Sequence, residues 1–212
     1  ADGAASMTQE YKDAQAEWLR ICQGWKHDYP VVLPKHMNGG TETEANVYAF
    51  AYEMSRRLNE NQIVVVGNGS ANVVKKGQRF ISNSGIASMG YGLPASIGAC
   101  VADHSQDIIL ITGDGSIQMN LQELETVVSH RMPIKIFIIN NQTQKNFFGE
   151  PLIGIGVDSG DLGFPSMEKL AWAYGFPYVS IHGNKELGEK VEETLAMDGP
   201  VICEVFVTLD QN

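Results

Sequence analysis

Cysteine is scarce in this 212-residue sequence, and its placement argues against a disulfide-stabilised fold and against a cysteine-bound zinc site. The three cysteines, Cys22, Cys100 and Cys203, are odd in number, lie far apart and form no Cys-x-x-Cys pair. Disulfide frameworks use an even set of cysteines, and zinc sites use closely spaced ones. Because Cys100 and Cys203 lie inside apolar runs, we interpret the cysteines as reduced residues of an intracellular, cytoplasmic protein.

Basic residues and long hydrophobic runs are also few. The sequence has 15 Lys and Arg residues against 25 Asp and Glu residues, a net charge of −10. A partner with a phosphate backbone or an anionic membrane surface requires a basic face, so we expect neither a nucleic acid nor a membrane as partner. The apolar runs are too short to span a bilayer, and the N-terminal stretch lacks the basic start and apolar segment of a secretion signal.

Aliphatic runs and glycine are abundant instead, and they predict the fold class. Strand patterns rich in Val and Ile alternate with helical patterns; the strands are expected over residues 63–69, 107–113, 133–140, 178–181 and 200–207. Unbroken β-branched runs that alternate with helices are typical of parallel strands covered on both sides. We therefore predict an α/β protein with an open, mostly parallel sheet and helices on both faces.

Several helix ends carry local signals. Ser166 is expected to cap a helix that ends at Gly175, and Thr41 with Glu44 forms a possible capping box for a helix over residues 41–58. Before that helix, a lone helical pattern with two tryptophans is followed by a Pro- and Gly-punctuated connector. We predict that residues 1–40 are the tail helix and linker of an upstream domain, and that residues 41–212 form the main domain.

Two of the expected strands end in motifs that can bind a cation. Gly113-Asp114-Gly115-Ser116 follows one strand, and Asn140-Asn141 closes the next. Ligands of open parallel sheets bind beyond the carboxyl ends of the strands, so the Asp114 carboxylate and the Asn141 amide oxygen are expected to share one crevice. Such oxygen ligands suit Mg²⁺, and the amides of Gly115 and Ser116, with a helix expected from near Leu121, would face an anion. Each motif alone is also ordinary turn chemistry.

Together the two motifs resemble the G-D-G and N-N signature of thiamine diphosphate (ThDP)-dependent enzymes. The stretch SNSGIASMGYGLPASIGAC, residues 82–100, is similar to a G-x-x-x-M-G-x-G-L-P-A-x-I-G-A stretch of acetolactate synthases and their decarboxylase relatives. The resemblance runs from about Trp18 to the C-terminus. It implies the diphosphate-binding domain of such an enzyme, the thiamine diphosphate-binding fold, and the cofactors ThDP and Mg²⁺.

The resemblance also implies a role for individual residues. Asp114 and Asn141 would coordinate Mg²⁺, and Gly113, Gly115 and Ser116 would lie at the diphosphate. The main-chain carbonyl of Ala87 would accept from the 4′-amino group of the cofactor. Met89 would fill the inside of the bend between the cofactor's two rings, so that the 4′-imino nitrogen reaches C2, and Met119 would line the same pocket.

Two junctions depart from the family pattern. The sequence is several residues short between Val74 and Lys75 and between Asn141 and Gln142. By counting, the third Mg²⁺ ligand would be the carbonyl of Thr143, but the shortening indicates that the family's true position has been skipped. Either these are genuine deletions, which would weaken cofactor binding, or residues are omitted from the sequence. We predict omission, with Cα separations above the ~3.8 Å of a peptide link at both junctions. Residues 144–151, with two phenylalanines, are a candidate for the substrate side of the site.

The resemblance implies a C-terminal fragment of an acetolactate synthase-like enzyme that acts on 2-oxo acids by decarboxylation and carboligation. In that family a glutamate from a pyrimidine-binding domain completes the site, so we expect these residues to be inactive alone and to pair with that domain, as a dimer. Three alternatives stay open: a stand-alone subunit of a two-chain decarboxylase, a non-catalytic degenerate module, and a nicotinamide-binding domain that would rest only on Gly67 and Gly69.

Overall fold

The fold is taken from a computed structural model, which describes residues 8–67, 74–141 and 164–208. The chain divides into two compact units, Ala1–Leu33 and Pro34–Asn212, and each is considered by itself. The first contains helix α1 (Gln9–Asp28), which has no buried residue. Thr8 caps α1 by accepting a 3.3 Å hydrogen bond from the amide of Tyr11, and Trp18 and Trp25 pack edge to face with ring centroids 5.6 Å apart. The helix expected in this region is confirmed.

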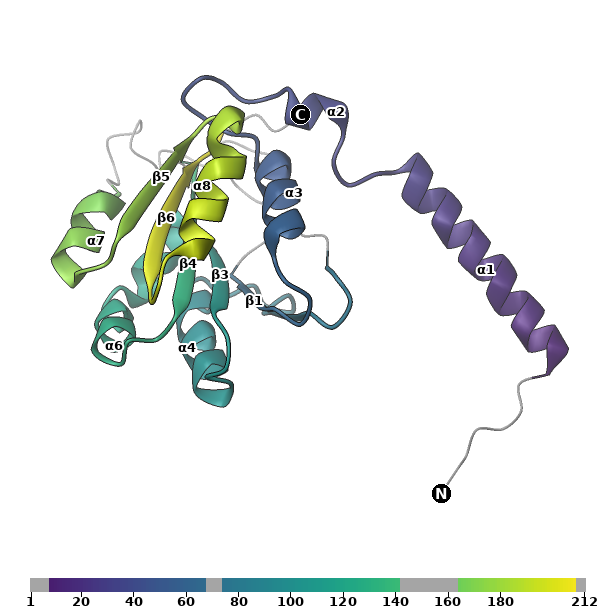
Figure 1. The fold of residues 1–212 in the computed structure, drawn as a ribbon, viewed down its shortest axis with the longest axis horizontal. Coiled ribbons are helices and arrows are strands. Elements are labelled where there is room, and N and C mark those ends of the chain that lie inside the picture. Colours follow the sequence, from purple (N-terminus) through teal and green to yellow (C-terminus); the bar gives the residue numbers. More distant parts are fainter. Residues whose placement is uncertain (1–7, 68–73, 142–163, 209–212) are drawn as a thin grey trace. The chain divides into compact units, whose positions relative to one another are not determined.

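The second unit is built on a six-stranded sheet in which every neighbouring pair is parallel (Figure 1). The strand order is β2-β1-β3-β4-β6-β5. The strands are β1 (Ile63–Val66), β2 (Arg79–Ser82), β3 (Ile108–Gly113), β4 (Ile134–Asn140), β5 (Tyr178–His182) and β6 (Val201–Phe206). The predicted open parallel sheet is therefore confirmed.

Helices cover both faces of the sheet, as predicted (Figure 1). They are α2 (Pro34–Met37), α3 (Val47–Arg57), α4 (Gly92–Ala102), α5 (Asp114–Ile117), the 3-10 turn η1 (Gln118–Asn120), α6 (Glu123–Ser129), α7 (Met167–Tyr174) and α8 (Asn184–Ala196). One core joins α3 and α8 to the sheet, and the other joins α4, α6 and α7 to its opposite face.

Alternation along the strands assigns side chains to the two cores. In β1, Val64 and Val66 belong to the α3 and α8 core, whereas Ile63 and Val65 belong to the other. All four are buried, because successive strand residues point to opposite faces and both faces are covered. Burial of each such aliphatic side chain stabilises the fold by about 1.5–3 kcal/mol relative to exposure.

Two helix ends agree with the predicted caps and one does not. The Ser166 hydroxyl accepts from the amide of Lys169, and Gly175 ends α7 in the left-handed conformation at φ 77°. The Thr41 and Glu44 capping box was wrong. Helix α3 begins at Val47, and its cap is Asn46, whose side chain accepts hydrogen bonds from the two amides at positions 48 and 49.

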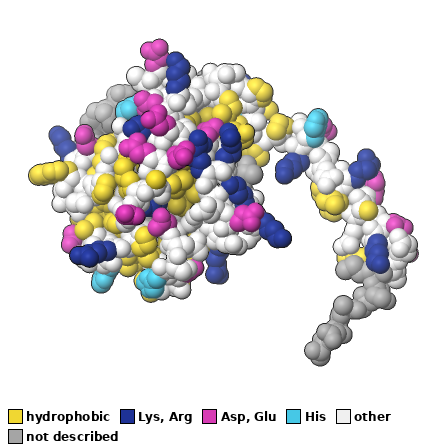
Figure 2. Space-filling view, in the orientation of Figure 1, with side chains coloured by type: hydrophobic (Ala, Val, Ile, Leu, Met, Phe, Trp, Pro, Cys, Tyr) yellow, Lys and Arg dark blue, Asp and Glu magenta, His cyan; other side chains and the backbone are white. Residues whose placement is uncertain are grey.

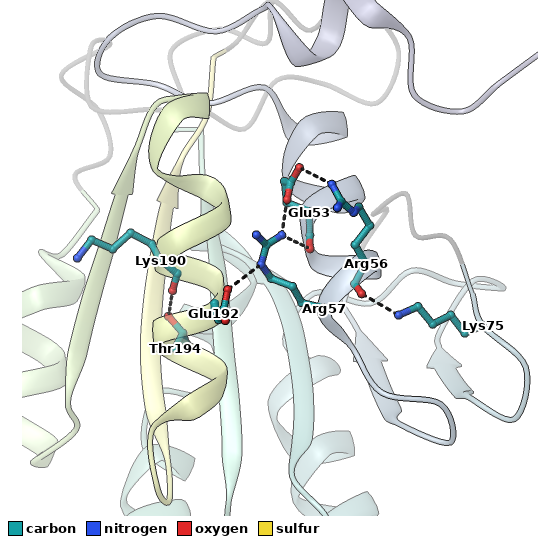
Figure 3. Close-up of polar contacts among 7 residues, drawn as sticks. All are labelled: Glu53, Arg56, Arg57, Lys75, Lys190, Glu192 and Thr194. Carbon is teal, nitrogen blue, oxygen red and sulfur yellow. Dashed lines mark hydrogen bonds and ion pairs between the residues drawn. The ribbon is translucent and has the colours of Figure 1, made fainter.

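Helices α3 and α8 are joined at their surface by charged side chains (Figure 3). The guanidinium of Arg57 on α3 pairs with Glu53 one turn earlier, and its Nε lies 3.8 Å from Glu192 on α8. Gly188 leaves room for this group, since a Cβ there would lie 2.8 Å from Arg57 Nη2. Lys75 Nζ donates to two carbonyls near the end of α3. Figure 2 shows acidic and basic side chains intermixed among the described residues of this face.

One lysine is fully buried at the start of β4. Lys135 is 0% exposed, and its ammonium donates to the carbonyl oxygens of Met197 and Gly199 and lies 3.5 Å from Asp107. A buried charge is tolerated only when it is paired and hydrogen-bonded, and this one is both. It lies at the opposite end of β4 from Asn140 and Asn141.

Candidate functional site

The strand ends that carry the candidate ligand residues lie near the point where the chain reverses direction across the sheet. The chain leaves β1 for β2 on one side, whereas it leaves β3 for β4 on the other. In open α/β sheets such a switch point creates a crevice beyond the carboxyl ends of the strands. Gly67 follows β1 and donates to the carbonyl of Ile111, so it lies directly beside the end of β3.

The backbone is packed closely at this crevice. A Cβ on Gly67 would lie 3.2 Å from Thr112 Oγ1, and a Cβ on Gly92 would lie 2.9 Å from Leu110 Cδ1 and 3.4 Å from Gly67 Cα. Glycine therefore lets the first turn of α4 approach the ends of β1 and β3. This contact brings the segment over residues 87–92 to the candidate site.

Asp114 lies at the end of β3 and is 5% exposed. Its Oδ1 accepts a 2.8 Å hydrogen bond from the amide of Gly115. The structure corrects the expected start of the helix. Helical conformation begins at Asp114 itself and runs through α5 and η1 to α6, rather than starting near Leu121. Gly113 caps this path, so Asp114, Gly115 and Ser116 form its first turn, where a carboxylate complements the helix dipole.

Asn141 follows β4, the neighbour of β3. The register pairs Gly113 of β3 with Ile139 of β4. Asp114 is one residue beyond Gly113 and Asn141 is two beyond Ile139, so both emerge from the same edge of the sheet, one position apart in register. One carboxylate and one amide oxygen are the hard ligands that Mg²⁺ binds together with phosphate oxygens. The two residues therefore fit a divalent ion that is completed by a diphosphate.

The loop before α4 is tied to the turn after β3. Ser116 Oγ accepts a 2.9 Å hydrogen bond from the amide of Gly90, and Asn120 Nδ2 donates over 2.7 Å to the carbonyl of Gly90. Gly90 adopts φ +85°, and a Cβ there would lie 2.7 Å from Met119 Cβ. Both main-chain groups of Gly90 are thus used to bring Met89 and Met119 to one place.

Ala87 has an unusual backbone conformation. Its φ is 55°, in the left-handed region, where a residue with a Cβ costs about 1–2 kcal/mol. The amide of Ala87 donates to the carbonyl of Asn83 over 2.8 Å, which closes the turn that holds it. Strained backbone of this kind clusters at functional sites. The predicted role of Ala87 uses its main-chain carbonyl, and this turn determines the direction of that carbonyl.

Apolar side chains are exposed around this loop. Ile86 is 84% exposed, Met89 37% and Met119 57%. Exposed apolar side chains that lie close together mark a binding surface more often than isolated ones do. Met89 and Met119 are neighbours through Gly90, and their exposure agrees with contact to a ligand rather than with core filling.

The sequence did not predict a partly buried hydrogen-bond chain that is centred on Glu204 and reaches the end of β4. Asn140 Nδ2 donates over 2.6 Å to Glu204 Oε1, and the Tyr178 hydroxyl donates to Glu204 Oε2. Burial and the bond to Glu204 raise the pKa of Tyr178 above its ordinary value, so the phenol keeps its proton. The available signal was Glu204 itself, a single charge inside the aliphatic run of β6.

The candidate site is not a metal centre built from a cluster of acidic, histidine and cysteine side chains. Among the described residues, no three His, Cys, Asp or Glu side chains are placed to hold a metal ion. Besides Asp114, a cation here would rely on Asn141, main-chain oxygens or phosphate. A cavity of about 610 Å³ lies between residues 37–42 and 182–186, and its lining includes none of the predicted site residues. The candidate site is therefore defined by the strand ends rather than by that cavity.

Some predicted features lie outside the described residues. These are the junction after Asn141, Thr143 and residues 144–151. At the other junction, Lys75 is held by its amide, which donates to Gln78 Oε1 over 2.8 Å, and by its ammonium at the end of α3. The predicted omission at Val74–Lys75 stays a prediction, and the mass of the purified protein against 23.2 kDa tests it.

The sheet topology defines an open α/β domain whose candidate ligand site lies at the switch point of the sheet. Comparison with known sequences gives the family. Residues 66–205 match the family described as "Thiamine pyrophosphate enzyme, C-terminal TPP binding domain", and the chain belongs to this family. The resemblance stated from the motifs is thereby confirmed.

The relatives found are acetolactate synthases. The chain is 31% identical over 214 residues to the acetolactate synthase large subunit of Porphyra purpurea, covering 95% of this chain and 35% of that protein. It is 32% identical over 209 residues to the large subunit of Cyanidium caldarium, with the same coverage of each. It is 31% identical over 206 residues to the mitochondrial acetolactate synthase catalytic subunit of Saccharomyces cerevisiae, covering 91% of this chain and 29% of that protein.

The chain spans about a third of the length of the curated relatives it matches. It is thus similar to the thiamine pyrophosphate-binding C-terminal part of acetolactate synthases. Within the described ranges, no helix is both long enough and apolar enough to cross a membrane.

Proposed function

We propose that this chain is the diphosphate-binding part of an acetolactate synthase-like enzyme that decarboxylates and ligates 2-oxo acids. In this proposal Asp114 and Asn141 would hold Mg²⁺, and the ion would in turn bind the diphosphate of ThDP. The observation that carries the proposal is the register of β3 and β4, which brings the residues after Gly113 and Ile139 to one edge of the sheet. The family match and the acetolactate synthase relatives support it.

The residues of this chain bind and orient the cofactor. Asp114 and Asn141 supply oxygen ligands, and the first helical turn, with Gly115 and Ser116, supplies amides that favour an anion. Met89 and Met119 contact the rings, and the carbonyl of Ala87 accepts a hydrogen bond from the amino group. When bound, ThDP would supply a nucleophilic carbon and an electron sink for the decarboxylation of a 2-oxo acid. The protein holds that group in one orientation.

These 212 residues do not complete the active site by themselves. The chain covers 35% or less of each relative described above, and the remaining parts are expected to include the pyrimidine-binding domain. A dimer is part of the proposal, since the site would be shared between subunits, and so is the cytoplasmic location. The 212-residue chain should bind ThDP weakly and release no CO₂ from a 2-oxo acid.

Calorimetric titration with ThDP in the presence and absence of Mg²⁺ tests this function. The wild type should bind ThDP only with Mg²⁺, with a dissociation constant in the micromolar to millimolar range. Asp114→Ala should weaken binding at least about tenfold, which is a loss of about 1.4 kcal/mol. The Asp103→Ala variant is a matched control, because Asp103 ends α4 at the opposite edge of the sheet.

Binding by the wild type and by Asp103→Ala, with loss in Asp114→Ala, supports the function. No Mg²⁺-dependent heat in the folded wild type contradicts it and favours a degenerate module. Binding without CO₂ release, followed by activity on addition of a separate chain that carries a pyrimidine domain, would favour the two-chain decarboxylase.

A further inference from the structure

A buried carboxylate lies inside the sheet next to the candidate metal site. Glu204 is in the interior of β6 and is 4% exposed. Its register partners are Ile138 in β4 and Ser180 in β5, so it lies between two strands rather than at the surface. An ionised carboxylate in such a place is costly unless its oxygens are hydrogen-bonded.

Both oxygens of Glu204 are used, and they join three strands. Oε1 accepts from Asn140 Nδ2 of β4 over 2.6 Å, and Oε2 accepts from the Tyr178 hydroxyl of β5. The three strands are neighbours in the order β4-β6-β5 (Figure 1). The chain from Tyr178 through Glu204 therefore ends on Asn140, the residue directly before Asn141.

Asn140 is held by its backbone as well as by its side chain. Its carbonyl accepts a 2.9 Å hydrogen bond from the amide of Val207. The end of β6 is fixed in turn, because Ala45 donates to the carbonyl of Phe206 and accepts from the amide of Thr208. The residue before Asn141 is therefore fixed both by its side chain, through Glu204, and by its backbone carbonyl, through Val207.

We propose that Glu204, supported by Tyr178, is a positioning residue for Asn141. By holding Asn140 it determines where β4 ends and directs the Asn141 side chain to the divalent ion. This inference rests on the proposed function, in which Asn141 binds that ion. Groups that orient a metal ligand without touching the metal typically change its affinity about 10–100-fold when they are removed.

Three variants separate the hydrogen bonds that Glu204 makes to Asn140 and Tyr178 from the negative charge of its carboxylate. Glu204→Leu keeps most of the volume but removes both acceptors. Glu204→Gln keeps a bridge without the charge, since its carbonyl can accept from Tyr178 while its amide donates to a flipped Asn140. Tyr178→Phe leaves the bond between Glu204 and Asn140 in place. Calorimetry gives the Mg²⁺ concentration for half-maximal ThDP binding, and electron paramagnetic resonance counts bound Mn²⁺ as a direct second readout.

Glu204→Leu should raise the half-saturating Mg²⁺ concentration at least about tenfold. Glu204→Gln should restore most of the affinity, and Tyr178→Phe should fall between the wild type and Glu204→Leu. Lys135→Met is the matched control, because it removes a buried, hydrogen-bonded charge at the other end of β4. It should lower the stability while leaving the Mg²⁺ requirement unchanged.

Equal Mg²⁺ requirements for Glu204→Leu and the wild type would overturn the proposal, as would a rise in Lys135→Met as large as that in Glu204→Leu. If Glu204→Leu does not fold, Tyr178→Phe decides in its place: it must raise the Mg²⁺ requirement while Lys135→Met does not, and equal values overturn the proposal. Failure of the proposed function is distinct, since the wild type itself would then show no Mg²⁺-dependent binding.

Discussion

Gly90 joins the two halves of the candidate site, and its replacement by alanine should destabilise the protein more than an ordinary loop substitution. Gly90 has φ +85°, and an added Cβ would lie 2.6 Å from Asn120 Nδ2 and 2.7 Å from Met119 Cβ. Asn120 could turn its side chain away. The Met119 Cβ is attached to the backbone, so relief of that contact requires the two segments to separate.

The magnitude follows from two effects. A residue with a Cβ in the left-handed region costs about 1–2 kcal/mol. Separation of the segments also weakens the bonds from Gly90 to Ser116 and from Asn120 to Gly90, at about 0.5–1.5 kcal/mol each. We expect Gly90→Ala to lower the free energy of unfolding by about 2–4 kcal/mol, which corresponds to a fall in Tm of about 5–15 °C for a chain of this length.

Urea unfolding monitored by circular dichroism measures this change, and Gly85→Ala in the same loop is the matched control. A Cβ on Gly85 would meet no atom within 4 Å, so we expect a change of at most about 0.5 kcal/mol in that variant. Should Gly90→Ala be as stable as Gly85→Ala, the contact between this loop and the turn after β3 would not be the constraint inferred here.

Three further predictions concern single groups. Ala87→Gly should raise the free energy of unfolding by about 0.5–1 kcal/mol, because relief of the left-handed strain at Ala87 exceeds the entropy that glycine adds to the unfolded chain. The control Ala99→Gly within α4 should instead lower the free energy of unfolding by about 1 kcal/mol. The opposite order of the two variants in urea unfolding would contradict the strain at Ala87. The hydroxyl and amide of Ser105, with Gln106, lower the pKa of Asp103 to about 2, so any stability from these bonds is present above the ordinary pKa and lost as the pH falls towards 2. Carboxyl ¹³C titration should show this pKa, and Ser105→Ala should raise it; an unchanged value would exclude the hydroxyl as the main cause. Burial raises the pKa of the Cys203 thiol to about 12 and also raises that of Cys100, so Ellman's reagent should modify the half-buried Cys22 first in the native protein, and Cys22→Ser should remove the fast phase.

Local sequence patterns correctly predicted the buried strands and the helix ends that depend on neighbouring residues. The runs at Ile63–Val66 and Ile108–Gly113 are unbroken and aliphatic, and only strands covered on both faces accommodate them. The cap at Ser166 and the left-handed terminator at Gly175 were also predicted correctly, since each depends on neighbours within one helical turn. Helix α1 was predicted for the same reason.

Features that depend on distant residues were not predictable in this way. The start of α3 is determined from far along the chain, because Asn184 Oδ1 accepts from the amide of Asn46 and Asn184 Nδ2 donates to the carbonyl of Gly39. These contacts hold the connector outside the helix, and the amide of Thr41 instead donates to the carbonyl of Glu44 in a local turn. Strand β2 was missed because Arg79–Ser82 is short and mostly exposed, and only its pairing with β1 makes it a strand.

The candidate site shows the same division. The sequence alone predicted Asp114, Asn141 and the loop with Met89 as site residues, because a carboxylate between glycines and an asparagine pair close two consecutive aliphatic strands. Tertiary structure alone decided that Gly90 joins that loop to Ser116 and that Glu204 holds Asn140, because these contacts cross 26 and 64 residues. Residue type states which chemistry is available, whereas the packing of distant strands determines which groups meet.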